Sequence, residues 1–459
     1  MNRKSALLFF CLLAFSVLPA LAWANPRTVR IGIQSGASTG TIESTEPMRC
    51  VDGKGRSLAA CSRALLEYSS GRLLVNGQAA DFPVEFQGPA VLRWNGRPYR
   101  GNLRLVTDGT GFSAVNVVDV ESYLRGVLKI EVNPAWPMEA LKAQAVIART
   151  YALRQTGRHG RNGFDLCATT HCQAYRGMSA EDPKTDRAIE ETRGIVVSYG
   201  SQLAQTFYFA DGAGWTADVS TVWGGGVPYL NCRPEPVSYE TPHSRWNAIL
   251  SQEAMQKTMK TLKAPVGTVL EVRPSEKDRG NRVTQLEIRG TERTVTVKGH
   301  AFRMAAGSNV IRSTLFEIVP AHGQVPASLP PIPATAPSPL QAQPSGHGED
   351  PLVTLTRQGA FSSAELMDML LHPEKREEYI RKAGGKPAPA NPPHPFPLPP
   401  APGVSRTGNA PSFFEFNGKG WGHGVGLSQW GAKALSEKGW DYRSILSHYY
   451  PGTSLSSMP

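Results

Sequence analysis

The sequence of 459 residues is poor in charged side chains and lacks the motifs of several common enzyme classes. Charged residues make up 19% and hydrophobic residues 40%, which is a globular and not a disordered composition. No glycine-rich segment ends in the Gly-Lys-Ser/Thr of a phosphate-binding loop, and no His-Glu-x-x-His motif is present. The net charge is +11, but no dense lysine/arginine block or nucleic-acid motif accompanies it. We therefore expect a partner other than nucleic acid.

Long apolar runs are also scarce, and the one that stands out lies at the N-terminus. Residues 7–18 are apolar, Arg3 and Lys4 precede them, and small residues occupy the positions that a signal peptidase reads before Asn25. We predict a signal peptide at residues 1–24. An uncleaved membrane anchor is the alternative, but the run is short for a span. Cleavage leaves a basic, exported chain without a membrane span, which suits an anionic envelope polymer in the periplasm, the cell wall or the medium.

Cysteine is rare, with six residues in the chain. Cys50 and Cys61 flank a glycine-containing loop, and we predict a disulfide between them because exported proteins permit such bonds. Closing a loop of that length contributes on the order of 3 kcal/mol. The other cysteines of the mature chain, Cys167, Cys172 and Cys232, have no such obvious pairing.

The hydrophobic pattern predicts many strands and a few helices. Strands are expected at residues 27–34, 73–75, 91–94, 103–106, 114–118, 195–198 and 203–209, with three more within 267–298. Asn95-Gly96 is a hairpin signal. Helices are expected at 138–154, 183–192 and 251–262. Because strands and helices do not alternate regularly, the predicted class is α+β, a strand-rich core with one long helix.

Residues 320–411 interrupt this pattern, since they are rich in proline and poor in large apolar residues. Such a segment cannot bury enough surface to offset its ordering entropy. We predict a flexible insertion between two parts of one core, residues 25–319 and 412–459. An amphipathic helix candidate at 362–382 leaves two interpretations open, a plain spacer or a segment that reaches a partner.

Glu131 is the candidate acid/base, in the connection that leads to the helix at 138–154. Ile130, Val132 and Trp136 can remove its carboxyl group from water. Desolvation raises a carboxyl pKa, and an acid that cleaves glycan must be protonated near neutral pH. The alternative is a glutamate that caps the helix or interacts with its dipole.

The predicted helix also carries candidate substrate-binding residues. Lys142 and Arg149 are seven residues apart and share a face, so they can orient an anionic sugar substituent or the carboxylate itself. Gln144 and Tyr151 complete this set.

A glycine-rich loop at residues 421–432 reads Trp-Gly-His-Gly-Val-Gly-Leu-Ser-Gln-Trp-Gly-Ala and leads into a helix. Its glycines allow the backbone to approach a ligand closely. We predict substrate contacts for Trp421, His423 and Gln429. The alternatives are a structural histidine, and tryptophans at 421 and 430 that fill the core.

The segment around Cys167 and Cys172 has the residue types of a zinc site. His171 lies between the two cysteines and His159 lies eight residues before the first, so the candidate ligands are both cysteines with His159 or His171. A Cys167–Cys172 disulfide, or a bond from one of them to Cys232, is the alternative. We expect any zinc to be structural and no cofactor to be required, since the motif of a zinc hydrolase is missing.

Together these segments resemble the SpoIID/LytB family, whose members include stage II sporulation protein D and the amidase enhancers. The resemblance rests on residues 121–151, on His-Cys-Gln-Ala-Tyr at 171–175, on Arg-Ser-Thr-Leu-Phe at 312–316 and on the 421–432 loop. It covers roughly residues 27–319 and 412–455. It implies that Glu131 is the essential glutamate, that Arg149 is the family's helix arginine, and that the Cys/His segment binds zinc as in some members.

The resemblance implies a peptidoglycan lytic transglycosylase that cleaves the MurNAc–GlcNAc bond of glycan without stem peptides and forms 1,6-anhydro-MurNAc. The alternative is a non-catalytic wall-binding protein that stimulates an N-acetylmuramoyl-L-alanine amidase. Members often carry Tyr-His-Ser where this chain has Tyr208-Phe209-Ala210, and the long insertion is a further departure. Nothing in the sequence indicates a role in sporulation itself.

Overall fold

A computed structural model describes residues 27–88, 91–321 and 410–458 of the chain. These residues all fall in one compact unit. The predicted signal peptide, residues 1–24, lies outside the described residues, and so do nearly all of the predicted insertion and its helix candidate. In the described part of the chain, no helix is both long enough and apolar enough to cross a membrane.

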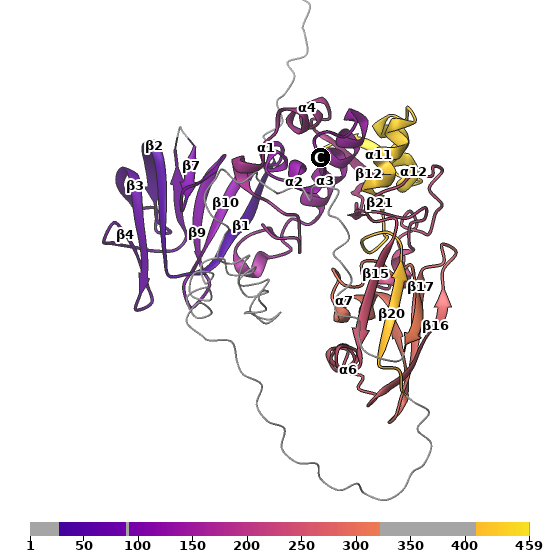
Figure 1. Cartoon of the computed structure of the whole chain (residues 1–459). Helices are drawn as coiled ribbons and strands as arrows, with labels where there is room; N and C mark the ends of the chain where they lie inside the picture. The colour runs from indigo at the N-terminus through magenta and orange to yellow at the C-terminus, as the bar shows by residue number, and fades with distance from the viewer. Residues whose placement is uncertain (1–26, 89–90, 322–409, 459) are drawn as a thin grey trace, which may run out of the picture. The chain divides into compact units, whose positions relative to one another are not determined.

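The N-terminal part forms a large, mostly antiparallel sheet (Figure 1). Its strand order is β11-β1-β10-β9-β6-β2-β3-β4-β5, and the β7–β8 hairpin joins through β2. Asn95 and Gly96 turn that hairpin with positive φ angles of 46° and 80°, as their sequence predicts. The strands are β1 Thr28–Ala37, β2 Thr39–Val51, β3 Ser57–Ser69, β4 Arg72–Val75, β5 Gln78–Ala80, β6 Val84–Gln87, β7 Leu92–Trp94, β8 Arg97–Tyr99, β9 Asn102–Thr107, β10 Phe112–Asp119 and β11 Leu166–Cys167.

Cys50 and Cys61 lie in this sheet as free thiols, so the predicted disulfide is not formed in the structure. The register explains why the pair is not directly opposed: Met48 pairs with Cys61 and Cys50 pairs with Leu58, with an irregularity between the two pairs. Cys50 is completely buried, and its burial, the nearby Cys61 and Asp52 raise its pKa to about 12. The thiol therefore stays protonated at neutral pH.

Four helices follow β10 in the chain: α1 Val120–Arg125, α2 Leu128–Glu131, α3 Met138–Arg154 and α4 Pro183–Glu191. The predicted bounds of α3 are confirmed, with Pro137 just before its first residue. Small alanine side chains lie on several sides of α3. Ala145 and Ala148 pack in the core of the large sheet, whereas Ala143 packs in a second core, so this helix joins the two.

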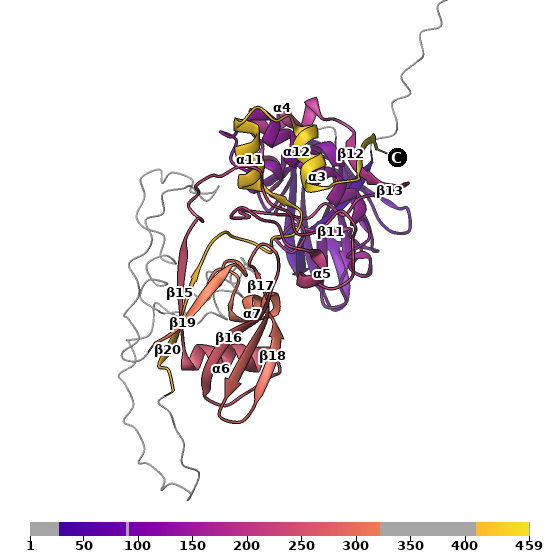
Figure 2. The same ribbon diagram turned by 90° about the vertical axis from the view of Figure 1, so that its right-hand side faces the viewer.

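The second core combines the middle of the chain with its C-terminal end. Figure 2 shows α11 and α12, in yellow, beside α3, which they contact. The strands β12 and β22 pair antiparallel, and β14 and β21 pair parallel. The bounds are β12 Ile195–Tyr199, β13 Gln202–Leu203, β14 Tyr208–Phe209, β21 Leu427–Ser428, β22 Ser454–Ser457, α5 Val219–Val222, α11 Gln429–Glu437 and α12 Tyr442–Tyr449.

A third core lies between two small antiparallel sheets, of order β15-β20-β19 and β16-β17-β18. The strand pair β19 and β20 runs from either side of residues 322–409, with Ala321 opposite Phe413. The predicted insertion therefore connects two neighbouring strands of one sheet. The bounds are β15 Trp246–Ser251, β16 Val269–Lys277, β17 Val283–Gly290, β18 Thr294–Lys298, β19 Phe316–Ala321, β20 Phe413–Gly418, α6 Gln252–Thr261 and α7 Gly299–Ala306.

The predicted class, a strand-rich α+β fold, is confirmed. One predicted strand is wrong in detail. Residues 203–209 do not form a continuous strand, because β13 ends at Leu203 and β14 begins at Tyr208 in a different sheet. The chain changes neighbours between them, and Thr206 is anchored there by donating its hydroxyl to the carbonyl of Ile147 on α3.

Candidate active site

Segments far apart in the sequence line one cavity of about 860 Å³. That volume is in the range of small-ligand sites. Its walls include Glu131 at the end of α2, Tyr151 on α3, Tyr208 on β14 and the loop residues Trp421 and His423. Of the predicted catalytic and substrate-binding residues, the cavity thus brings together Glu131, Tyr151, Trp421 and His423.

Glu131 is the last residue of the short helix α2, and not part of an open strand-to-helix connection. Val132 and Trp136 are buried beside it, as the sequence suggested for desolvation. Burial raises the pKa of Glu131 to about 7, against the opposing effect of two hydrogen-bond donors, the backbone of Ala174 and the hydroxyl of Tyr208.

Amide side chains fix the position of Glu131 and of its neighbour Tyr208. The Gln429 side-chain amide donates to the backbone carbonyl of Glu131 at 3.1 Å, and lies 3.5 Å from the carbonyl oxygen of Gln144. Both glutamines are buried, so they support the Glu131 backbone and do not make the substrate contact that the sequence predicted. The Gln173 amide donates to the Tyr208 hydroxyl at 3.2 Å.

Arg149 has a structural role in place of the predicted substrate contact. Its side chain is fully buried, and its Nε and Nη2 donate to the Glu121 carboxylate at 2.9 and 2.7 Å. Its Nη1 donates to the carbonyl of Ile195. This network ties α3 to α1 and to the start of β12, and no part of the guanidinium faces the cavity.

Lys142 likewise lies outside the cavity. Its ammonium group is 2.8 Å from Glu139 on the same helix and 2.8 Å from Glu191 at the end of α4. It therefore links two helices. The shared face predicted for Lys142 and Arg149 turns towards α4 and α1, and not towards a ligand.

His423 lines the cavity as a neutral residue. Its Nδ1 accepts a hydrogen bond from the backbone of Val425 at 3.1 Å, and its ring also bonds to the backbone of Tyr208. Burial, with the charges of nearby basic groups, lowers the pKa of His423 to about 3. With its ring nitrogens engaged, His423 shapes the wall and does not exchange protons near neutral pH.

Several lining residues were not predicted, among them Tyr208, Trp223 and Arg303. Tyr208 occupies the tyrosine position of the family's Tyr-His-Ser, and only the other two residues are replaced. The sequence comparison stressed those two replacements and so did not single out the retained tyrosine. Trp223 follows a four-residue helix and Arg303 lies on α7. Neither belongs to a recognisable motif, so only the fold reveals them.

The Cys/His segment brings four side chains together at the edge of the same cavity, which His171 and Cys172 line. The ligand atoms of His159, Cys167, His171 and Cys172 all lie within 4.8 Å of one another. The His159 Nε2–Cys172 Sγ distance is 3.3 Å, and His171 Nδ1 lies 3.6 Å from each sulfur. Ligands around a tetrahedral zinc ion lie roughly 3.3–3.8 Å apart, given Zn–S and Zn–N lengths of about 2.3 and 2.0 Å. The four side chains therefore fit a zinc ion. The ligand set includes both His159 and His171, whereas the sequence predicted only one of them.

The electrostatics of this cluster also favour a cation. Hydrogen bonds from Cys172 and Thr169 lower the pKa of the Cys167 thiol, so its sulfur is available as a thiolate. Both cysteines are free, and the alternative disulfide between them is not formed in the structure.

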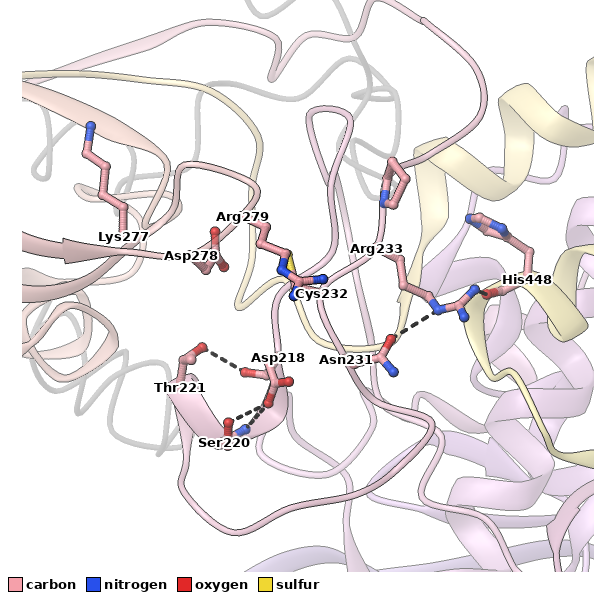
Figure 3. Close-up of a pocket in the computed structure, with 11 residues that line it drawn as sticks. Asp218, Ser220, Thr221, Asn231, Cys232, Arg233, Lys277, Asp278, Arg279 and His448 are labelled. Carbon is pink, nitrogen blue, oxygen red and sulfur yellow. Dashed lines mark hydrogen bonds between the residues drawn. The ribbon is translucent and has the colours of Figure 1, made fainter.

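Cys232 lies in a different cavity of about 780 Å³, shown in Figure 3. Its neighbours there include Asp218, Arg233 and Asp278, and the predicted alternative of a bond from Cys232 to the Cys/His segment is not formed. Some polar groups of this cavity are engaged, since Asp218 caps α5 and Arg233 donates to Asn231, whereas the buried Asp278 Oδ2 and His448 Nε2 have no hydrogen-bond partner in the described part of the chain. The Glu131 cavity remains the candidate active site because it brings together four of the residues predicted from the sequence.

Comparison with known proteins supports a family assignment. The family described as Stage II sporulation protein (SpoIID) matches residues 108–199. The amidase enhancer of Bacillus subtilis (strain 168) is 26% identical over 337 residues, 73% of this chain and 40% of that protein. An uncharacterized protein of Brachyspira hyodysenteriae (strain ATCC 49526 / WA1) is 30% identical over 215 residues, 46% of this chain and 58% of that protein. Stage II sporulation protein D of Bacillus amyloliquefaciens is 22% identical over 362 residues, 76% of this chain and 77% of that protein.

The fold and the site define an α+β protein with one desolvated carboxyl group in a ligand-sized cavity. Residues 108–199 match the SpoIID family, and the chain is similar to an amidase enhancer and to a stage II sporulation protein D, which supports the resemblance to the SpoIID/LytB family. The chain spans less than two thirds of the length of the first two relatives, 40% and 58%.

Proposed function

We propose that the protein is an exported lytic transglycosylase that cleaves the MurNAc–GlcNAc bond of peptidoglycan and forms 1,6-anhydro-MurNAc. The observation that carries the proposal is the state of Glu131, whose pKa of about 7 leaves a large fraction protonated at neutral pH. Among the described residues, no second carboxylate lines the cavity. Most glycosidases that hydrolyse need two carboxyl groups, so a single one favours a reaction that uses the same group twice.

In the first step, protonated Glu131 donates its proton to the glycosidic oxygen while the C1–O bond breaks. The N-acetyl group of the muramic acid unit stabilises the positive charge that develops at C1. The Glu131 carboxylate that remains is stabilised by its two donors, the backbone of Ala174 and the hydroxyl of Tyr208.

In the second step, the Glu131 carboxylate removes the proton of the sugar's own C6 hydroxyl. The C6 oxygen attacks C1 and closes the 1,6-anhydro ring. Glu131 is then protonated again, so the cycle balances without water.

We also propose that the Cys/His cluster holds a structural zinc ion through His159, Cys167, His171 and Cys172. A bound zinc would tie the loop between α3 and β11 to the segment after β11, beside the cavity. The reaction steps above use only the side chains of the chain, so zinc supports the site and not the chemistry.

A second function is favoured by one relative's name. The amidase enhancer of B. subtilis covers 73% of this chain, which supports a wall-binding protein that stimulates an amidase. The replacement of two residues in the family's Tyr-His-Ser segment also favours it. This function predicts binding to cell wall without glycan cleavage, and binding that is insensitive to Glu131→Gln.

The test is digestion of purified sacculi by the intact protein, followed by mass spectrometry. The wild type should release anhydro-muropeptides, and Glu131→Gln should lower the rate by two to four orders of magnitude. The matched control is Glu437→Gln, which removes an exposed carboxylate that pairs with Lys433 on α11. No anhydro product from the wild type, or an equal amount from Glu131→Gln, would contradict the proposal.

A further inference from the structure

Trp223 presents an unusually exposed indole to the cavity. It is 44% exposed although it packs against the rings of Phe207 and His423, with centroid distances of 4.9 and 4.8 Å. The ring of His300 on α7 meets it edge-on at 6.0 Å. Three rings therefore hold the indole while part of it stays open in the cavity wall. A rigid aromatic surface of this kind suits stacking on the apolar face of a sugar.

Arg303 brings an uncompensated positive charge to the same cavity. Its side chain is nearly buried, and its Nε donates to the carbonyl of Arg312 at 3.1 Å. Its Nη1 lies 3.5 Å from the sulfur of Met304, and within the part of the chain that the structure describes no carboxylate forms an ion pair with it. Burial, then the charge of Arg282, lowers the pKa of Arg303 to about 10, so it remains charged at neutral pH.

The surroundings of Arg303 repel cations. Burial lowers the pKa of His300 to about 4, and the charge of Arg303 contributes to that shift. His423 is affected in the same way. A buried charge without a counter-ion is costly, and a protein that retains one beside a cavity gains most when an anionic ligand supplies the counter-ion.

The cavity wall is continuous from the acid to this charge. The Tyr208 hydroxyl bonds to Glu131, the Tyr208 backbone bonds to His423, and His423 contacts Trp223. Trp223 then meets His300, one helical turn before Arg303 on α7. A glycan strand that places a glycosidic bond at Glu131 can therefore reach Trp223 and Arg303 with a nearby sugar unit.

We propose that Trp223 and Arg303 form a subsite for a sugar unit that carries a free carboxylate. The indole stacks on the ring and the guanidinium pairs with the carboxylate, a match for which arginine is well suited. The assignment to a glycan strand rests on the proposed function. In such a strand the matching group is the lactyl carboxylate of a MurNAc unit that bears no stem peptide, since attachment of a peptide converts it to a neutral amide.

The experiment measures binding of two glycan preparations to the intact protein carrying Glu131→Gln, which prevents turnover. One preparation has free muramic carboxylates, and the other is the same material with these groups converted to methylamides. Titration calorimetry should show at least roughly tenfold tighter binding of the free carboxylate form. The preference should shrink as salt is raised.

Substitutions in this background assign the preference to residues. Arg303→Gln should abolish it and Arg303→Lys should keep part of it, whereas Arg279→Gln, an exposed arginine of the other cavity, should leave it unchanged. Trp223→Ala should weaken binding of both preparations and leave their ratio unchanged.

Two outcomes would overturn the subsite: equal binding of the two preparations by the Glu131→Gln protein, or a full preference retained in a folded Arg303→Gln protein. The comparison of the two preparations with the Glu131→Gln protein does not depend on the folding of the Arg303→Gln protein. Thermal unfolding would show whether the Arg303→Gln protein is folded. A failure of the proposed function is distinguishable, because absence of anhydro products from the wild type leaves the binding preference measurable.

Discussion

At the scale of single residues, Glu131 and Arg149 show how burial assigns opposite roles to charged groups. Arg149 is buried with a carboxylate at 2.7 Å, so its charge is compensated and it holds the fold together. No cation of the described residues contributes to the pKa of Glu131, and burial shifts that pKa to about 7. A group in that state can both give and accept a proton under ordinary conditions.

The pH dependence of activity should report this group directly. Because protonated Glu131 is the form that starts the reaction, kcat/KM should be constant below about pH 6 and should fall about tenfold per pH unit above about pH 7. Initial rates on a soluble glycan between pH 4.5 and 9 would check this. An apparent pKa near that of an ordinary glutamate, about 4.5, would contradict the assigned environment.

The sequence identified Glu131 because the apolar residues that desolvate it are its near neighbours in the chain. It also identified Trp421 and His423, whose loop is marked by glycines. It misplaced Lys142 and Arg149 because periodicity shows that two side chains share a helix face but not what that face contacts. Their partners Glu191 and Glu121 lie on other helices, and only tertiary packing decides between a ligand and an ion pair.

At the scale of elements, the Cys/His cluster forms because separate parts of the chain come together, which sequence spacing does not reveal. His159 lies in the loop that follows α3, Cys167 ends β11, and Cys172 follows after a further turn. The pairing of β11 with β1 fixes Cys167 beside Gly32, which brings the loop back to the end of α3. The sequence could therefore name the ligands but could not decide between His159 and His171.

Removal of zinc should destabilise this segment. Treatment with a strong chelator, or the Cys167→Ser and Cys172→Ser substitutions, should lower the melting temperature by roughly 5–10 °C. Elemental analysis of the purified protein should give about one zinc per chain. Cys232→Ser is the matched control and should change neither zinc content nor melting temperature. A protein without zinc, with a melting temperature unaffected by chelator, would exclude the metal.

Longer elements were predicted well where one hydrophobic period persists. Helix α3 keeps its period for its whole length, and the predicted and observed bounds agree. The short helix α2 was missed, because four residues are too few to show a helical period. That miss matters for the site, since Glu131 is the last residue of α2.

At the scale of the whole molecule, the core closes through pairing of distant parts of the chain. Strand β20 lies between β15 and β19, and it contributes Phe414 and Phe416 to the third core. Gln429 from the C-terminal part donates a hydrogen bond to the backbone carbonyl of Glu131, the proposed catalytic residue. The cavity can therefore form only when the chain after residue 409 has joined the part before residue 322.

Replacement of residues 322–409 by a four-residue turn should preserve the fold, because Ala321 and Phe413 already face each other in adjacent strands. Closing a shorter loop costs less entropy, about 0.6 kcal/mol for each halving of its length, so the shortened protein should be stabilised by on the order of 2–3 kcal/mol. Chemical denaturation would measure this, and activity on a soluble glycan should be unchanged. A large loss of stability or of glycan cleavage would show that these residues support the core or the site.

The central claim is that one carboxyl group, Glu131, acts first as acid and then as base, without water. Digestion of glycan in water enriched in oxygen-18, with mass spectrometry of the new sugar ends, tests it most directly. The account predicts 1,6-anhydro ends without label, whereas a hydrolytic muramidase run in parallel gives reducing ends with one labelled oxygen. Labelled reducing ends formed by this protein, and lost in Glu131→Gln, would contradict it and require a hydrolytic water at the site.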